Sequence, residues 1–142
     1  MSKSPKPSPE QIVTHMLEND AFSQWLGVKI TKVEEGACNL RCTVHDGMLN
    51  GYKITHGGAI FSLADSAIAF ASASYGRLAV AIDHSISFIK KAVPGDTLSV
   101  KAETVSMGYK TGVIRVEIKN QDNELIAIIK GTVYRTSEDF DL

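Results

Sequence analysis

The segment GGAIFSLADSAIAFASASYG, residues 57–76, decides the fold class of this chain. It holds one charged residue, Asp65, and no proline, and as a helix it would run about 30 Å at about 1.5 Å per residue. That length also suits a membrane span, but Ala, Ser and Gly dominate the segment and a carboxylate lies near its middle. The pattern therefore predicts a buried central helix, with other elements covering every side of it.

Strand-like segments flank this helix on both sides. Two alternating runs precede it and four follow it, separated by turn signals such as Gly36, the PGD of 94–96 and the QDN of 121–123. The apolar–polar alternation over 113–119 is typical of a half-exposed antiparallel strand. The expected strands are 28–35, 37–44, 78–89, 96–106, 112–120 and 124–135. We therefore predict an α+β domain with an antiparallel sheet around one long helix.

A shorter helix is expected near the N-terminus. Ser8 is a capping residue, Pro9 suits a first helical turn, and apolar residues recur at helical spacing from Ile12 to Leu17. A second short helical segment over 21–26 would end at Gly27.

Length and composition fit a single domain. The chain has 142 residues, 44% of them hydrophobic and 22% charged, which suits one core. We expect a flexible lead-in over 1–9, the domain over 10–136 and a tail over 137–142. A net charge of −1 lacks the basic excess that nucleic-acid binding draws on, so no nucleic-acid partner is expected.

The cellular compartment is inferred from the N-terminus and the cysteines. The polar, proline-rich start MSKSPKPSPEQ does not match a secretory signal. Cys38 and Cys42 fall on one expected strand, about 13 Å apart, too far to pair with each other. Free thiols favour a reducing cytoplasm.

Asp65 is the first candidate functional residue. On a helical wheel it shares a stripe of small residues with Gly58, Ser62, Ala69, Ser72 and Gly76. A carboxylate on a buried stripe is costly unless it is paired, hydrogen-bonded or functional. A hydrogen bond to a Ser or His of another segment is the structural alternative to a catalytic role.

The start of the central helix is the second candidate. His56, Gly57 and Gly58 come where the first backbone N–H groups of a helix are unsatisfied and its dipole is positive. A ligand oxygen can approach glycine closely, which is the physical form of an oxyanion hole. A tight loop-to-helix turn would explain the same glycines.

The stretches LNGYKITHGGAIFSLADSAIAFASASYG (49–76) and ISFIKKAVPGDTL (86–98) resemble the PaaI-type hotdog thioesterases, a family named for phenylacetate degradation. The resemblance covers roughly residues 22–135 and implies a hotdog fold that hydrolyses acyl-CoA, with an aryl or phenylacetyl acyl group favoured. It implies that Asp65 acts as general base or nucleophile and that the Gly57 amide polarises the thioester carbonyl. Asn50 would orient water or the acid, and His56 would support the turn or the carbonyl.

The remaining expectations concern substrate binding. Gly58 and Ser62 are expected to line the site, and Lys90 and Lys91, with Lys53 and Arg77, are cations available for the CoA phosphates. For any one cation a solvated surface charge is the simpler interpretation. No cofactor is expected, and no His, Cys or Asp cluster has metal-ligand spacing.

One position departs from the family pattern, and three histidines fall outside it. Some members hold the lytic water with a hydroxyl on the strand after the helix, where this chain has Ala81 or Ile82. Ser85 lies nearby, but the pattern assigns the water-holding role to no residue. The histidines His15, His45 and His84 match nothing in the pattern and are interpreted as surface or ordinary polar residues.

Helix geometry adds a prediction about assembly. Gly57 and Asp65 lie eight residues apart, hence about 12 Å along one helix, so one thioester carbonyl cannot touch both within a chain. If both act on the same carbon, they come from different subunits of a homodimer with shared sites. The resemblance implies edge-to-edge dimers that pair again into a homotetramer.

Two other functions are alternatives to hydrolysis. A hotdog hydratase or dehydratase would carry an Asn-Pro-x-His pattern before the helix, which this chain lacks. A non-catalytic acyl-CoA-binding module would gain nothing from a buried, unpaired Asp65.

Overall fold

The computed structural model describes residues 5–142, so the first four residues of the expected lead-in lie outside it. The helices are α1 (Pro9–Glu18), α2 (Ala21–Leu26), the 3-10 helix η1 (Asp46–Met48) and α3 (Gly57–Ala73). The strands are β1 (Lys29–Glu34), β2 (Ala37–Thr43), β3 (Arg77–Phe88), β4 (Thr97–Met107), β5 (Thr111–Lys119) and β6 (Leu125–Asp139). The predicted order of elements is confirmed.

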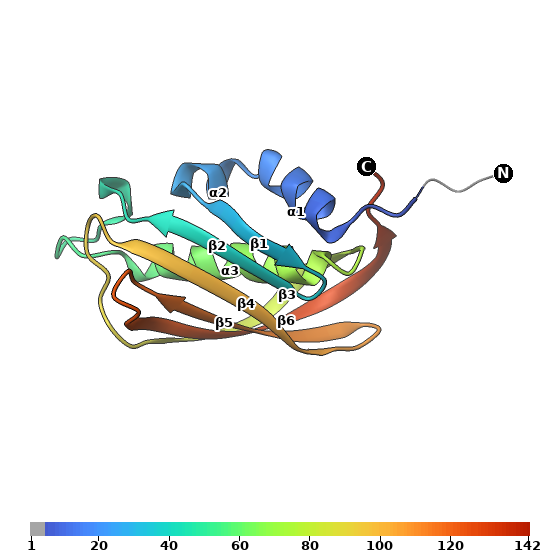
Figure 1. Cartoon of the computed structure of the whole chain (residues 1–142). Coiled ribbons are helices and arrows are strands. Elements are labelled where there is room, and N and C mark those ends of the chain that lie inside the picture. Colours follow the sequence, from blue (N-terminus) through green and yellow to red (C-terminus); the bar gives the residue numbers. More distant parts are fainter. Residues whose placement is uncertain (1–4) are drawn as a thin grey trace.

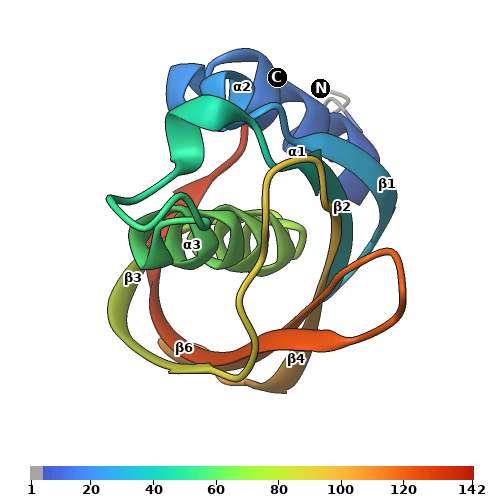
Figure 2. The same ribbon diagram turned by 90° about the vertical axis from the view of Figure 1, so that its left-hand side faces the viewer.

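All six strands form one antiparallel sheet in the order β1-β2-β4-β5-β6-β3. The sheet curves around α3, while α1 and α2 lie over the side that the sheet leaves open (Figures 1 and 2). A sheet wrapped around one long helix is the hotdog fold that the resemblance implied. Since β3 pairs only with β6, and β1 only with β2, these two strands are the edges of the sheet.

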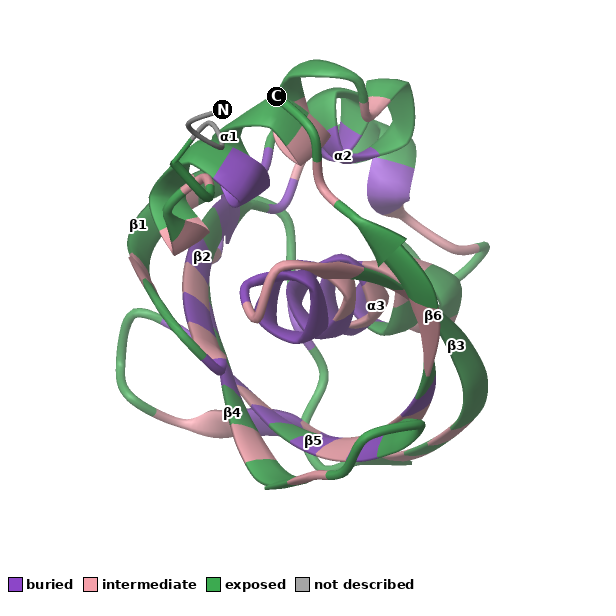
Figure 3. Ribbon diagram, turned by 90° about the vertical axis from the view of Figure 1, so that its right-hand side faces the viewer, coloured by how far each residue is buried: buried purple, intermediate pink, exposed green. Residues whose placement is uncertain are grey.

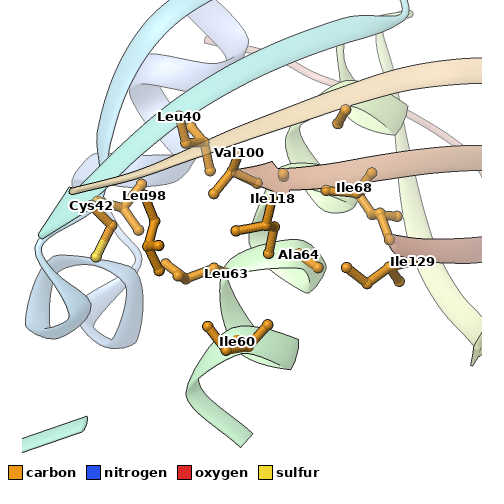
Figure 4. Close-up of a cluster of buried hydrophobic side chains, with 14 of the residues drawn as sticks. Leu40, Cys42, Ile60, Leu63, Ala64, Ile68, Leu98, Val100, Ile118 and Ile129 are labelled. Carbon is orange, nitrogen blue, oxygen red and sulfur yellow. The ribbon is translucent and has the colours of Figure 1, made fainter. Parts of the chain in front are cut away.

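The core lies between α3 and the concave face of the sheet. Side chains of α3 such as Ile60, Leu63 and Ile68 meet side chains of β2, β4, β5 and β6, including Leu40 and Ile118 (Figure 4). In β5 the even-numbered residues from 112 to 118 are buried, as the alternation predicted. A buried hydroxyl pair, Ser23 Oγ and Ser66 Oγ at 2.7 Å, joins α2 to α3.

Short sequence signals account for the ends of the first elements. Ser8 and Gln11 form a reciprocal capping box at α1, and Pro9 occupies the first turn. Gly27 ends α2 at φ 83°, in the left-handed region. Gly36 turns the β1–β2 hairpin at φ 84°, and a Cβ there would lie 2.4 Å from Tyr75 Oη. The predicted hairpin is confirmed by the pairing of β1 with β2.

Two boundaries differ from expectation. The central helix ends at Ala73 rather than at 76, before Gly76 at φ 106°. Strand β6 continues to Asp139, into the expected tail 137–142, because its end pairs with the start of β3 at Arg77. Between residues 5 and 142, no helix combines the length and apolarity that crossing a membrane requires.

Both cysteines are free thiols on the buried face of β2. Burial raises the pKa of Cys38 to about 12 and that of Cys42 to about 11. The Cys42 thiol also donates to the Leu26 carbonyl oxygen at 3.0 Å. Their role in this fold is packing.

Candidate active site

Asp65 lies near the middle of α3, and its side chain is 50% exposed. Along the same side of the helix, Gly58 and Phe61 are exposed and Ser62 and Ala69 are half-buried. The expectation of a buried stripe is therefore wrong for the single chain. A helical wheel groups residues on one face, but packing decides which face is covered, and here only the stripe's end at Ser72 is fully buried.

The structure pairs Asp65 with His84 of β3. Oδ1 of Asp65 lies 2.7 Å from Nε2 of His84, and the His84 side chain is only 5% exposed. The interpretation of His84 as a surface residue is thus wrong, since its side chain is buried. A signal existed in the sequence, because His84 and Ile86 alternate onto the same inward face of β3, and a histidine on that face needs a polar partner.

The N-terminus of α3 presents a free donor. His56 is the N-cap, and its Nδ1 accepts a hydrogen bond of 2.8 Å from the Gly58 amide. No acceptor for the Gly57 amide occurs among residues 5–142. The Phe88 ring packs here, because a Cβ on Gly57 would lie 3.1 Å from Phe88 Cζ. The Gly57 N–H is therefore available to a ligand oxygen.

Asn50 belongs to the loop that leads into α3. Its Oδ1 accepts hydrogen bonds from the Tyr52 amide (2.9 Å) and the Ile54 amide (3.4 Å). The Thr55 amide then donates to the Ala92 carbonyl oxygen, which anchors the loop next to the segment between β3 and β4. The Asn50 side-chain amide group has no acceptor within residues 5–142, so it can still donate to a ligand.

A surface pocket of about 300 Å³ brings several candidate residues together. Asn50, Gly57, Lys90 and Lys91 all line it, whereas Asp65 does not. Thr55 also lines it, and its buried Oγ1 has no hydrogen-bond partner in the described chain. Sequence reasoning missed this hydroxyl, since only the fold shows that it is buried. The rest of the wall is mainly apolar: Ile54, Ile60, Phe88, Ile89, Ala92 and Ile126.

Gly58 and Ser62 lie on the Asp65 side of α3, and their polar groups have partners in the chain. The Gly58 amide is used by His56, and Ser62 Oγ donates to the Gly58 carbonyl oxygen at 2.7 Å. Gly58 is exposed, although a Cβ there would lie 3.0 Å from His56 Nδ1, and the Ser62 hydroxyl oxygen is left as an acceptor.

The candidate cations differ in their surroundings. Lys90 pairs with Glu124, and this hydrogen bond is the main reason why the pKa of Glu124 lies below its usual range. Lys91 is exposed and makes no ion pair within residues 5–142. Arg77 lies at the far end of α3, where its guanidinium donates to the Tyr109 carbonyl oxygen at 2.6 Å. Arg77 is therefore far from the Gly57 pocket.

The other histidines are accounted for by local contacts. His15 is exposed on α1, as expected. His45 accepts from the Gly47 amide and contacts the Trp25 carbonyl oxygen, so it stabilises the η1 turn. Residues 5–142 contain no group of three or more His, Cys, Asp or Glu placed to hold a metal ion.

Comparison with known proteins gives a family. Residues 52–127 match the Thioesterase superfamily model. An Archaeoglobus fulgidus protein is 44% identical over 131 residues, which is 92% of this chain and 85% of that protein. The Escherichia coli acyl-coenzyme A thioesterase PaaI is 42% identical over 120 residues, 84% of this chain and 86% of that enzyme.

Solved structures agree with the sequence relatives. The E. coli PaaI structure superposes with a TM-score of 0.92 at 38% identity, covering 97% of this chain and all (100%) of the other. A Streptococcus mutans protein solved bound to acetyl-CoA superposes with a TM-score of 0.78 at 32% identity, covering 80% of this chain and 91% of the other. Since the family model covers more than half of the chain, including α3 and the strands β3, β4 and β5, this chain belongs to the thioesterase superfamily.

Proposed function

We propose that this protein hydrolyses an acyl-CoA thioester to the free acid and CoA. The observation that carries the proposal is the unpaired Gly57 amide, which opens onto an apolar pocket on the helix that also carries Asp65. The E. coli relative is named an acyl-CoA thioesterase, and the S. mutans structure holds acetyl-CoA. Both support CoA as the carrier of the acyl group.

Each residue then has a definite task. The thioester oxygen accepts a hydrogen bond from the Gly57 amide, which stabilises the negative charge that forms on it. Asp65 either removes a proton from the attacking water or attacks the carbonyl carbon itself, giving an anhydride that water hydrolyses. In both routes the carbon–sulfur bond breaks and CoA leaves as a thiolate. His56 supports the turn that presents Gly57.

The site is shared between two subunits of a homodimer. Asp65 does not line the Gly57 pocket of its own chain, and the two residues are about 12 Å apart along α3. β3 is an edge strand whose ribbon is coloured largely as exposed (Figure 3). Its apolar residues Val80, Ile82 and Phe88 are exposed by 54%, 59% and 57%. An apolar edge of this kind suits pairing with the same strand of a second copy. Two such dimers would form the homotetramer that the family resemblance implies.

CoA is held by its phosphates at the mouth of the pocket. Lys91 is the leading cation, because its charge has no partner within residues 5–142, while Lys90 is already paired with Glu124. The buried Thr55 hydroxyl gains a hydrogen-bond partner when substrate or its water enters. The two free cysteines are in keeping with a reducing cytoplasm as the site of action.

An aryl or phenylacetyl acyl group fits the pocket wall. Phe88 lies against Gly57 and can stack on an aromatic ring, while Ile60 and Ile126 provide further apolar surface.

Thiol release from phenylacetyl-, benzoyl- and hexanoyl-CoA tests the proposal. We expect kcat/KM for the better aryl substrate to exceed that for hexanoyl-CoA by about tenfold or more. Preference for hexanoyl-CoA would contradict the aryl assignment alone, whereas no thiol release from any of the three would contradict hydrolysis.

Asn50 is expected to contribute a donor to catalysis in addition to its role in the loop. Asn50→Ala should lower kcat by roughly ten- to a thousandfold, as for loss of one orienting group. Asn50→Asp is the matched control, because its carboxylate still accepts from the Tyr52 and Ile54 amides but lacks the donor. Both variants should lose kcat to a similar extent in steady-state assays. Near-normal kcat in Asn50→Asp would assign Asn50 to the loop alone, and a change only in KM would assign it to binding.

A further inference from the structure

We propose that His84 is a positioning residue for Asp65. It holds one carboxylate oxygen, Oδ1, so that the other, Oδ2, faces the substrate. Gly131 of β6 provides the space that this arrangement needs. The proposal rests on the proposed function, since it assigns Asp65 to the reaction.

The contact between the two side chains joins the buried ring of His84 to the half-exposed carboxylate of Asp65. His84 is 5% exposed, with its ring 5.6 Å from that of Phe61, whereas Asp65 is 50% exposed. The 2.7 Å bond from Nε2 therefore ties a half-exposed carboxylate to a buried ring. Oδ2 has no hydrogen-bond partner among residues 5–142. Oδ1 is thus hydrogen-bonded within the protein, and Oδ2 is available for reaction.

The proton positions follow from the second nitrogen of the ring. Nδ1 of His84 lies 2.8 Å from the Asp83 carbonyl oxygen, which can only accept, so Nδ1 carries a proton. One further proton then lies between Nε2 and Oδ1, and in the form that reacts His84 donates it to the ionised Asp65. The contact then occupies Oδ1 and leaves Oδ2 without a proton.

The neighbouring strand is built to admit the ring. Gly131 pairs directly with His84 across β3 and β6. A Cβ on Gly131 would lie 2.7 Å from His84 Nδ1, 2.8 Å from His84 Cε1 and 2.6 Å from Ile68 Cδ1. Because real Cβ contacts are longer than this, a residue other than glycine would crowd both the imidazole and the end of the Ile68 side chain, and these groups would have to shift. Gly131 is therefore a second residue through which the orientation of Asp65 can be tested.

The first experiment measures steady-state kinetics of His84 variants. His84→Ala leaves the Asp65 carboxylate free to rotate, and a misplaced reacting group lowers the rate with little effect on binding. We expect kcat to fall about ten- to a hundredfold with KM changed by less than about twofold. His84→Gln, whose side-chain amide can donate in place of Nε2, should recover kcat to within about threefold of wild type. Equal losses in the Ala and Gln variants would contradict positioning by this hydrogen bond.

The second experiment introduces the clash. Gly131→Ala should lower kcat about tenfold in the wild-type background and by less than about twofold when combined with His84→Ala, because the displaced ring is then absent. Overlap with Ile68 is the same in both backgrounds, so the difference isolates His84. Equal losses in the two backgrounds would overturn the role given to Gly131.

A spectroscopic measurement is independent of activity. The chain has four histidines, so ring nitrogen–proton NMR spectra are simple to assign. In wild type the signal of the His84 Nε2 proton should be protected from exchange with water. In Asp65→Ala this protection should be lost. Full activity of Asp65→Asn would remove Asp65 from the mechanism and the positioning role of His84 with it, whereas no thiol release from the wild-type protein would overturn the proposed function. Loss of activity in Asp65→Asn together with wild-type kcat in His84→Ala would overturn the positioning role alone.

Discussion

Asp65→Asn is expected to lower kcat at least about a hundredfold while fold and oligomer stay intact. The amide keeps the shape of the side chain and can still accept from His84 Nε2, but it can neither take a proton from water nor attack a thioester. Because Asp65 is half-exposed in the single chain, we expect the free energy of unfolding to change by no more than about 1 kcal/mol. Thiol release and thermal unfolding measure the two effects.

Asp122→Asn is the matched control for this prediction. It makes the same chemical change in an exposed turn outside the candidate site. Its kcat should equal that of wild type. Wild-type kcat in Asp65→Asn would remove Asp65 from the mechanism, whatever the substrate.

Mixing Asp65→Asn with Gly57→Pro subunits is expected to restore activity from two inactive proteins. Gly57→Pro lacks the amide donor, and proline is tolerated in the first turn of a helix. In a mixed dimer one site has both defects and the other has neither. Random exchange makes half the dimers mixed, each with one intact site of two, so activity should reach about a quarter of the wild-type level.

A Gly57→Ala control separates the loss of the Gly57 amide donor from steric crowding next to Phe88. Gly57→Ala keeps the N–H but places a Cβ 3.1 Å from Phe88 Cζ, at the outer end of a side chain that can move. It should retain much more activity than Gly57→Pro. Asp65→Asn and Gly57→Pro must each be inactive alone and show the wild-type mass by light scattering. No recovery after exchange verified with two affinity tags would mean that Asp65 and Gly57 do not meet across an interface.

The sequence predicted those features that depend on local chemistry. The uncharged run around Asp65 indicated the central helix, since a helix that is apolar on all sides has to be covered. Alternation over 113–119 and the glycine and proline turns indicated antiparallel strands, because side chains alternate across a sheet. The same local reasoning placed Ser8 at the start of α1 and Gly27 at the end of α2. The same reasoning placed the end of β6 at residue 135, which is too early. Residues 136–139 have no apolar alternation and are held in the strand by pairing with β3.

The features around the candidate site depend on which distant segments meet. Strand order places β3 beside β6, so that β3 becomes an edge, and no local pattern encodes that neighbour. The register between these strands shifts between Ala81 and Asp83, and this shift sets His84 opposite Gly131 and next to Asp65. A one-residue change of register reverses which side chains face the helix. The sequence therefore determined that Asp65 needed a partner or a function, and only tertiary packing decided that the partner is His84.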